Sequence, residues 1–446
     1  MLIVCFFLVG LLYITRRVKG PIWLLSFAWL LCMLPVAVGF IKYSYFSPWD
    51  AWFVFVLTAY ILSFAVGVVV HDKALLAYPV KNSEEADACR YALGWAKFAW
   101  VAGAAGSALI IIDYVIYKGS GLNDLAALRD LIVKADSVSW FMRIGSVLTW
   151  GCLYCFIFAL FFRQTLSRAK FIFFIFPVTG YFLVALLSAG RQTALQIIIF
   201  AFLVEFLRFS RATVRKKKEK TSRMFLLGIT FVMVVYMGYV AVLRNDGLID
   251  NDKAVVLASL FDFTLSSTAQ VIIEFMGESL KSTVIEALVY FSHSIPLFSK
   301  FLTIEFQQSY PGTMTFPFIL RQLEPFTGVS VIGSARAINQ LMTETGVIGV
   351  GWTTSISAYI IDFGYIGALL VLFLQGFYTA YYWRRAVRGN DFNEALIALV
   401  LLALIIYMPL LAASSETNLL LLWFFVDMAS VMRKRRPRQT AITTVV

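Results

Sequence analysis

The chain has 446 residues, of which 60% are hydrophobic, 16% aromatic and only 14% charged. Soluble domains average roughly 25% charged residues, so this composition excludes an ordinary soluble protein. The formal charge of +12 does not indicate a nucleic-acid partner, because the basic residues stand in short segments between long apolar runs, as they do in the cytoplasmic loops of membrane proteins.

Apolar runs long enough to cross a bilayer recur along the whole chain. A transmembrane helix needs about 20 apolar residues. Eleven candidate spans follow in chain order: 2–15, 21–41, 51–70, 92–116, 141–162, 170–189, 192–207, 224–242, 364–383, 394–413 and 417–432. No small-residue cleavage site follows the first run, so we expect a retained helix there rather than a signal peptide. The predicted fold class is an all-α polytopic membrane protein.

The basic residues between the spans predict the orientation. With the N-terminus outside, most Lys and Arg fall on the inner side, including the run RFSRATVRKKKEKTSR (208–223) and the tail RKRRPR. The reversed orientation would place the lysine run outside, against the positive-inside rule. We therefore expect a multi-pass protein of the bacterial cytoplasmic (inner) membrane with an outer N-terminus and a cytoplasmic C-terminus.

This topology divides the chain into four parts. Residues 1–242 hold the first eight spans, 243–352 form one large external loop, 353–432 hold the last three spans and 433–446 form a basic cytoplasmic tail. A second outer loop, 117–140, is shorter. The large loop contains amphipathic stretches such as AVVLASLFDFTLSSTAQVIIEFMGESL, which predict short helices lying on or dipping into the outer leaflet.

Arg191 stands inside an apolar run from Phe171 to Leu207 that is too long for one span. The run is better interpreted as a hairpin of two spans with its tip at SAGRQT, which places Arg191 at the outer interface. An arginine there can snorkel and anchor the hairpin. It can also hold a phosphate in a membrane-level cavity, because its planar fork pairs bidentately with phosphate oxygens.

Other arginines are expected on the same outer side. Arg244 follows the span that ends at Val242, Arg129 lies in the shorter outer loop, and Arg321 and Arg336 lie in the long one. Together they predict an outward-facing basic pocket. Taken alone, Arg244 is equally well explained as a solvated loop charge, and the other three are better explained so.

Two further titratable residues are candidates for chemistry. Asp362, in WTTSISAYIIDFGYIG, opens a late span, where a carboxylate is costly unless it is paired. A salt bridge to one of the arginines is the alternative. His293 can act as a general base near neutral pH or be an ordinary hydrogen-bonded loop histidine. Tyr290 belongs to a set of loop aromatics that either stack on sugar faces or anchor the loop in the leaflet.

The sequence predicts no metal site and no cofactor. It contains no P-loop, no G-x-G-x-x-G, no H-E-x-x-H and no G-x-S-x-G motif, and only two histidines. Cys152 and Cys155 form a C-x-x-C inside an apolar span without ligand partners, which favours helix packing over a redox or metal role.

An ordered set of motifs resembles the oligosaccharide repeat-unit polymerases, the O-antigen or Wzy-type family. The set comprises SAGRQTALQIIIF at the hairpin tip, YVAVLRNDG at the start of the big loop, ALVYFSHSIPLFSKF within it, and the Thr-rich entry into YIIDFGYIG, which includes Thr354. These motifs cover most of the second half of the chain, and the first half is similar in its pattern of spans.

The resemblance implies a metal-independent, inverting polysaccharide polymerase that moves a glycan from undecaprenyl diphosphate to a second lipid-linked repeat unit. Arg191, Arg244, His293 and Asp362 are then the expected catalytic residues. Arg129, Arg321, Arg336, Tyr290 and Thr354 are the expected substrate-binding residues. The implied partners are the undecaprenyl-diphosphate-linked oligosaccharide, the lipid bilayer and a chain-length regulator protein.

Two alternative functions stay open at this stage. An O-antigen ligase or a similar transferase uses the same donor with another acceptor. A flippase for lipid-linked oligosaccharides is a transporter, and transporters place ionisable residues deep within several spans and have shorter external loops. Here most charges lie at or outside the predicted boundaries, which favours the enzyme.

Overall fold

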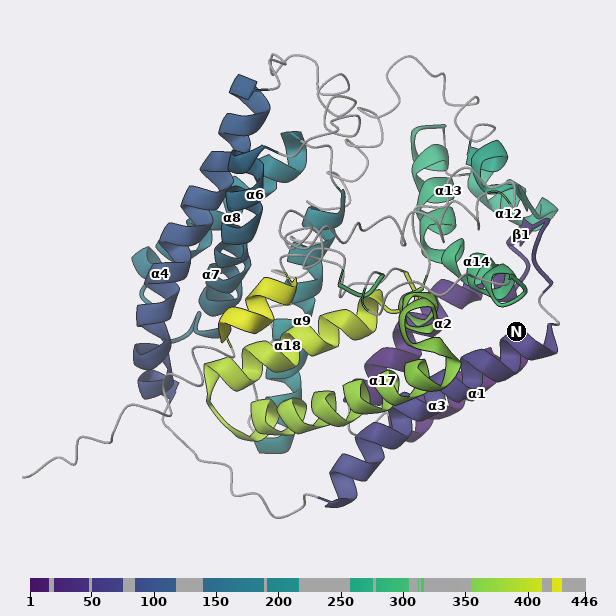
Figure 1. Ribbon diagram of the computed structural model, residues 1–446, viewed down its shortest axis with the longest axis horizontal. Helices are drawn as coiled ribbons and strands as arrows, with labels where there is room; N and C mark the ends of the chain where they lie inside the picture. The colour runs from purple at the N-terminus through teal and green to yellow at the C-terminus, as the bar shows by residue number, and fades with distance from the viewer. Residues whose placement is uncertain are drawn as a thin grey trace, which may run out of the picture.

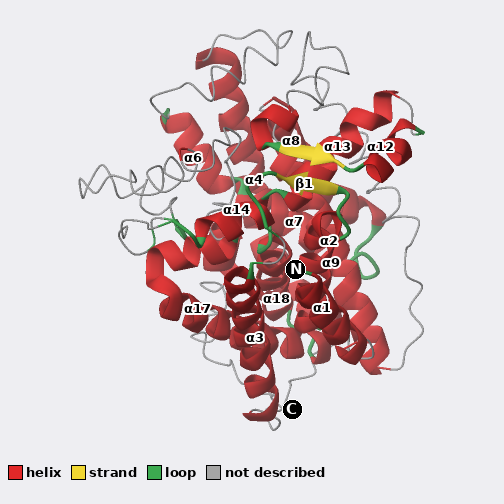
Figure 2. Cartoon of the chain, turned by 90° about the vertical axis from the view of Figure 1, so that its right-hand side faces the viewer, coloured by secondary structure: helices red, strands yellow, loops and turns green. Residues whose placement is uncertain are grey.

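The computed structural model describes residues 1–15, 20–47, 50–74, 85–117, 139–187, 191–215, 257–275, 278–304, 312, 314–316, 343, 354–410 and 419–426. These residues are mostly helical (Figures 1 and 2). The helices are α1 Leu2–Thr15, α2 Pro21–Ala37, α3 Ala51–Ala74, α4 Glu85–Ile112 with a π-helical turn at Asp113–Tyr117, α6 Trp140–Leu148, α7 Trp150–Phe161, α8 Arg168–Leu187, α9 Arg191–Arg215, α12 Ser267–Glu274, α13 Glu278–Ser292, α14 Ser294–Phe301, α17 Ser355–Arg388 and α18 Phe392–Tyr407. Two short helices cover 257–261 and 419–426.

Six described segments are long and apolar enough to cross a membrane: Ala51–Asp72, Ala86–Ile116, Trp140–Phe161, Arg168–Leu187, Thr193–Ala212 and Ser355–Arg388. Three shorter apolar helices, α1, α2 and α18, accompany them. The predicted span 224–242 lies outside the described residues, and 417–432 is described only over 419–426. The polytopic helical fold is confirmed, while the number eleven stays a prediction.

Two details of the predicted fold are wrong. The span expected to open at Gly364 begins at Ser355, and Gly364 breaks α17 with φ 69° and ψ 177°. A left-handed φ costs glycine little, so the chain can bend there and continue as a helix. The described residues are also not all helical, because β1 (Ile41–Tyr43) pairs antiparallel with β2 (Phe263–Leu265).

Helices α3 and α17 pack along most of their length and run side by side (Figure 1). Their backbones touch at two glycines. A Cβ on Gly67 would lie 2.1 Å from the carbonyl oxygen of Phe373, and one on Gly376 would lie 2.1 Å from that of Phe64. Small residues permit such close approach of membrane helices, and van der Waals contact then replaces the hydrophobic driving force that lipid does not supply.

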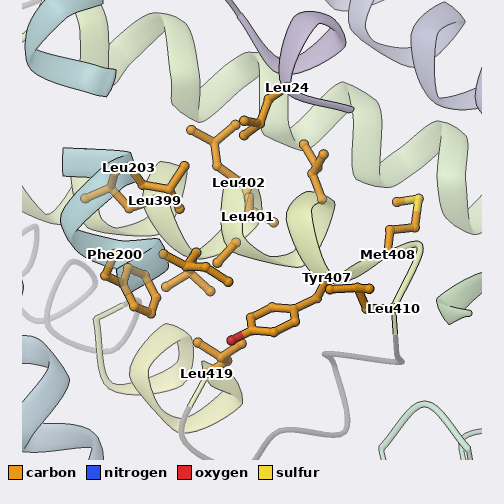
Figure 3. Packing of buried hydrophobic residues seen from close by; sticks show 14 of the residues in the cluster. Leu24, Phe200, Leu203, Leu399, Leu401, Leu402, Tyr407, Met408, Leu410 and Leu419 are labelled. Carbon is orange, nitrogen blue, oxygen red and sulfur yellow. The ribbon is translucent and has the colours of Figure 1, made fainter. Parts of the chain in front are cut away.

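Helix α18 lies at the centre of the apolar core. Figure 3 shows its side chains, among them Leu399, Leu402 and Tyr407, meeting those of α9 and Leu24 of α2. Helices α4, α6, α7 and α8 form a second group at the left of Figure 1 and pack on one another. Helix α9 contacts α7, α8, α17 and α18, so it joins the two groups.

One end of the bundle collects ion pairs, and we call it the basic end. Arg384 on α17 pairs with Asp72 on α3 at 2.6 Å, and Arg385 pairs with Glu394 on α18 at 2.5 Å. Arg211 on α9 donates from Nε to the carbonyl of Ala386 at 2.7 Å. The C-terminal ends of α3, α9 and α17 and the start of α18 therefore meet there.

The segment predicted to contain short helices does contain them. Helices α12, α13 and α14 gather beside the β1–β2 ribbon, at the upper right of Figure 1 and around the yellow strands of Figure 2. Because α2 leads directly into β1, this group is attached to the end of the bundle at which α2 finishes.

Candidate functional site

Four chain segments distant in sequence meet at a buried polar corner opposite the basic end. It consists of the turn 292–294, residues 408–409 after α18, residues 354–355 at the head of α17, and Tyr43. The Tyr43 hydroxyl lies 2.9 Å from Ser292 Oγ, and Ser294 Oγ donates to the Pro409 carbonyl at 2.5 Å. The backbone N–H of Ser355 donates to the Met408 carbonyl at 2.9 Å.

His293 lies inside this corner rather than on a loop surface. Its side chain is buried, its Nδ1 lies 3.0 Å from the Val289 carbonyl, and its ring contacts those of Phe261 and Tyr290. Burial lowers the pKa of His293 to about 4, although hydrogen bonds with the Val289 and Tyr290 backbone act the other way. The imidazole is thus neutral at pH 7, and a substrate hydroxyl reaches it only if the ring is uncovered.

Thr354 belongs to the same corner as a helix cap. The residue is fully buried, and its hydroxyl accepts from the Ser357 backbone N–H at 3.3 Å. A threonine at this position satisfies one of the free N–H groups at the head of a helix. Thr354 therefore holds the start of α17 in place. Tyr290, the other predicted substrate-binding residue here, is partly buried beside His293.

Asp362 anchors a piece of the predicted large loop. Its carboxylate accepts the Met314 backbone N–H at 3.0 and 3.2 Å and that of Thr315 at 2.6 Å. The side chain is buried, and it lies two residues before the break at Gly364. Its cost of burial is offset by backbone donors, which the sequence alone did not suggest.

Arg191 is the first residue of α9, which begins within the predicted hairpin tip SAGRQT. The pair of spans expected on either side of that tip is present as α8 and α9. Helix α9 has 25 residues and so rises about 36 Å, more than the roughly 30 Å hydrocarbon core of a bilayer. Arg191 and the basic end therefore lie on opposite sides of any membrane that α9 spans.

The other four predicted arginines lie outside the described residues: Arg129, Arg244, Arg321 and Arg336. Whether they join Arg191 in one pocket stays a prediction. Among the residues that the structure does describe, no group of three His, Cys, Asp or Glu side chains gathers in a way that could hold a metal ion.

Sequence reasoning missed a buried ion pair in α9. Glu205 pairs with Arg163 at 2.6 Å and with Arg208 at 3.5 Å. Arg208 also donates to the Phe161 carbonyl at 2.9 Å. The signal was present, since a carboxylate and an arginine three residues apart share one helix face. The pair locks α9 to the end of α7.

Several apolar helices, a buried polar corner and a basic opposite end define a polytopic integral membrane protein. The chain belongs to the family described as O-antigen polysaccharide polymerase Wzy, whose model matches residues 1–426. It is therefore a membrane protein of polysaccharide biosynthesis that polymerises O-antigen repeat units. No curated protein and no solved structure matches the chain.

Replacing Asp362 by Asn is expected to loosen the segment 314–315. The amide has a single acceptor oxygen and no charge, so the Met314 and Thr315 N–H groups must share one neutral acceptor, at a cost of about 1–3 kcal/mol. Thermal unfolding in detergent and limited proteolysis measure the effect. Asp391→Asn is the matched control, because Asp391 caps α18 by accepting from the Asn393 N–H, and Asn caps equally well. Equal unfolding temperatures for the two variants would contradict the anchor role.

Acid is expected to destabilise the corner through His293. The folded-state pKa of His293, about 4, lies below the ordinary histidine pKa of 6.5, so the unfolded chain binds the proton first as the pH falls. Stability is full above about pH 6.5, and roughly 3 kcal/mol is lost by pH 4. His293→Gln should remove this part of the acid sensitivity. The measurement is the difference in unfolding temperature between pH 7 and pH 4, and an identical difference in wild type and variant would contradict it.

Proposed function

We propose that the chain transfers a glycan from undecaprenyl diphosphate to a sugar hydroxyl on a second lipid-linked repeat unit, at the outer face of the bacterial cytoplasmic membrane. The family covers the polymerisation of O-antigen repeat units. The donor lipid, the face of the membrane and the residues that act are what the proposal adds.

Support for the outer face comes from the two ends of the bundle. The basic end carries Arg384, Arg385 and Arg211, and basic residues favour the cytoplasmic side. Because α9 begins at Arg191 and reaches the basic end after 25 residues, Arg191 then lies on the outer side. In this proposed orientation the N-terminus is outside, the C-terminus is cytoplasmic and the polar corner is at the outer face.

The proposed chemistry is a displacement at the anomeric carbon of the donor. The acceptor hydroxyl forms a new C–O bond to that carbon, and the electron pair of the broken C–O bond leaves with undecaprenyl diphosphate. Negative charge grows on the diphosphate as the bond breaks. A guanidinium that pairs more strongly with the leaving group in the transition state lowers the barrier, by roughly 3–4 kcal/mol for one well-placed donor.

Arg191 and Arg244 are proposed for this role, and they supply the positive charge that a metal supplies in other transferases. Arg129, Arg321 and Arg336 are proposed to hold the substrates. The acceptor's proton goes to a base, for which His293 is favoured over Asp362. Both oxygens of Asp362 already accept backbone N–H groups. In His293, Nδ1 lies against the Val289 carbonyl, so Nε2 is the ring atom proposed to take the proton.

The observation that carries the proposal is the position of Arg191 at the head of a helix that spans from the polar-corner end to the basic end. The diphosphate of a membrane-bound polyprenyl lipid must lie at headgroup depth, and an arginine at that depth can pair with it. A hairpin anchor alone does not require a buried corner of serines, tyrosine and histidine at the same end of the bundle.

Reconstitution tests the proposal directly. The purified protein in liposomes, given synthetic undecaprenyl-diphosphate-linked repeat units, is expected to produce a ladder of longer glycans, and to do so in the presence of EDTA. Loss of the ladder on chelation would contradict the metal-independent mechanism. Movement of the donor across the bilayer without elongation would instead support a transporter.

A deletion strain separates polymerase from ligase. Loss of a polymerase leaves single repeat units on the final acceptor, whereas loss of a ligase leaves long lipid-linked chains unattached. We expect the first result. Co-purification with a chain-length regulator protein, which stays a predicted partner, can be examined in the parent strain.

A further inference from the structure

An apolar pocket of ≈ 250 Å³ lies between α2, α9, α13 and α18. Every residue that lines it is apolar or a cysteine. On α2 the lining residues Leu24, Ala28 and Cys32 are four apart, so they form one stripe along the helix. Ile199 of α9 and Phe291 of α13 close the other sides.

The pocket opens sideways, toward the surface that faces lipid. Its inner wall is buried, with Leu24 1%, Ala28 6% and Cys32 2% exposed, whereas Phe27 and Leu31 at its edge are 41% and 49% exposed. Helix α2 is apolar along its whole length, so in a membrane this edge meets hydrocarbon rather than water. A lipid chain can therefore enter the pocket from within the bilayer.

The upper end of the pocket adjoins the polar corner. Phe291 directly precedes Ser292 and His293, and Leu410 directly follows Pro409, whose carbonyl accepts from Ser294. The pocket is thus continuous with the place where a polar headgroup is expected. Volume also limits the occupant, because small-molecule pockets measure about 300–1,000 Å³, so this one holds a few carbon units of a chain and not a whole lipid.

Helix α9 connects the pocket with Arg191. Ile198 and Ile199 line the pocket seven and eight residues after Arg191, which is about 10–12 Å along the helix axis. A cation at the membrane surface with an apolar pocket one headgroup-depth below it matches a lipid that has an anionic head and a long apolar tail. A neutral ligand does not match the cation, and a water-soluble ligand does not match the apolar pocket.

We propose that this pocket holds the first prenyl units of the donor's polyprenyl tail while the diphosphate lies at the level of Arg191, an inference that depends on the proposed donor. Holding the tail fixes the depth and direction of the C–O bond that must break. An ordinary phospholipid chain in the pocket would have no such consequence for the reaction, and the experiment distinguishes the two.

Ala28→Phe fills the pocket, and Ala105→Phe, on the exposed face of the membrane helix α4, is the matched control. Two donors with the same glycan diphosphate are compared, one with the full undecaprenyl tail and one with a short ten-carbon prenyl tail. For Ala28→Phe we expect KM for the long-tailed donor to rise about tenfold or more, since each buried methylene that loses its site weakens binding about fourfold. The short-tailed donor should lose affinity by a similar factor, because its two prenyl units are the ones that the pocket holds. Ala105→Phe should change KM for neither donor.

Binding is measured separately, so that a result is obtained even if polymerisation fails. Native mass spectrometry of the detergent-purified protein is expected to show retained undecaprenyl monophosphate for wild type and its loss for Ala28→Phe. Ile199→Ala, which enlarges the pocket instead of filling it, serves if the Phe variant does not fold, and should weaken retention.

Equal retention of phosphatidylglycerol and undecaprenyl monophosphate by wild type would overturn the inference in favour of a general lipid site. So would an unchanged KM for the long-tailed donor in a folded Ala28→Phe protein. Selective retention of the polyprenyl phosphate by a protein that makes no polymer would leave the pocket assignment standing and remove the proposed function.

Discussion

Arg191→Ala is expected to abolish polymer while the protein still inserts and accumulates normally. Removing a single donor to a developing oxyanion costs about 10²–10³-fold in kcat, or roughly 2.7–4 kcal/mol. Arg191→Lys should restore activity poorly, because a lysine carries the charge without the planar fork that pairs bidentately with phosphate. The measurement is glycan chain length on the cell surface, together with protein abundance in the membrane fraction.

Arg143→Ala is the control for this experiment. Arg143 lies in the first turn of α6, three residues after its first residue, Trp140. Its guanidinium lies 5.7 Å from the Trp140 ring centre. Its loss removes a positive charge from the same end of the bundle without touching the proposed site. If Arg191→Ala cells make chains of normal length, Arg191 is a hairpin anchor and the proposed mechanism is wrong.

Gly67→Ala is expected to cause a large loss of stability, because the α3 and α17 backbones touch at this glycine. The new Cβ would lie 2.1 Å from the carbonyl oxygen of Phe373, so the two helices must separate. Overpacking costs about 1–3 kcal/mol where side chains can adjust, and backbone cannot adjust as they do, so we expect at least about 3 kcal/mol. Thermal unfolding of the detergent-solubilised protein measures the change.

Gly94→Ala provides the matched comparison. Gly94 also lies inside a membrane helix, α4, but a Cβ there meets nothing within 4 Å. Alanine is a better helix former than glycine by up to about 1 kcal/mol, so this variant should be neutral or slightly stabilised. If Gly67→Ala unfolds at the same temperature as Gly94→Ala, the close α3–α17 contact is not present in the folded protein.

Sequence reasoning located the membrane helices well and their ends less well. Nine of the predicted spans coincide with described apolar helices, because twenty apolar residues in a row leave few structures open to a chain in a bilayer. The start of α17 was missed by nine residues. Ser355 to Phe363 carries an aspartate and polar residues, and contacts with 314–315 and with Met408 help to offset the cost of burying them.

The candidate site shows the same division. Arg191 was recognisable from sequence because a cation after three small residues inside an apolar run is costly and conspicuous. Tyr43, Ser294 and Pro409 were not recognisable, since each is an ordinary residue in its own segment. They become a site only when β1, the α13–α14 turn and the end of α18 meet.

By itself, the sequence determined that this protein is a membrane protein, which segments are apolar enough to span, and where its basic residues concentrate. Those properties depend on composition and on order along the chain, and the bilayer acts on them segment by segment. Only the tertiary structure decided that Asp362 is satisfied by backbone donors, that His293 is buried and neutral, and that a lipid-facing pocket adjoins the polar corner. These depend on residues from different elements of the chain coming within hydrogen-bonding or van der Waals distance, 47 and 48 positions apart in the case of Asp362 and its donors, and no local pattern records such contacts.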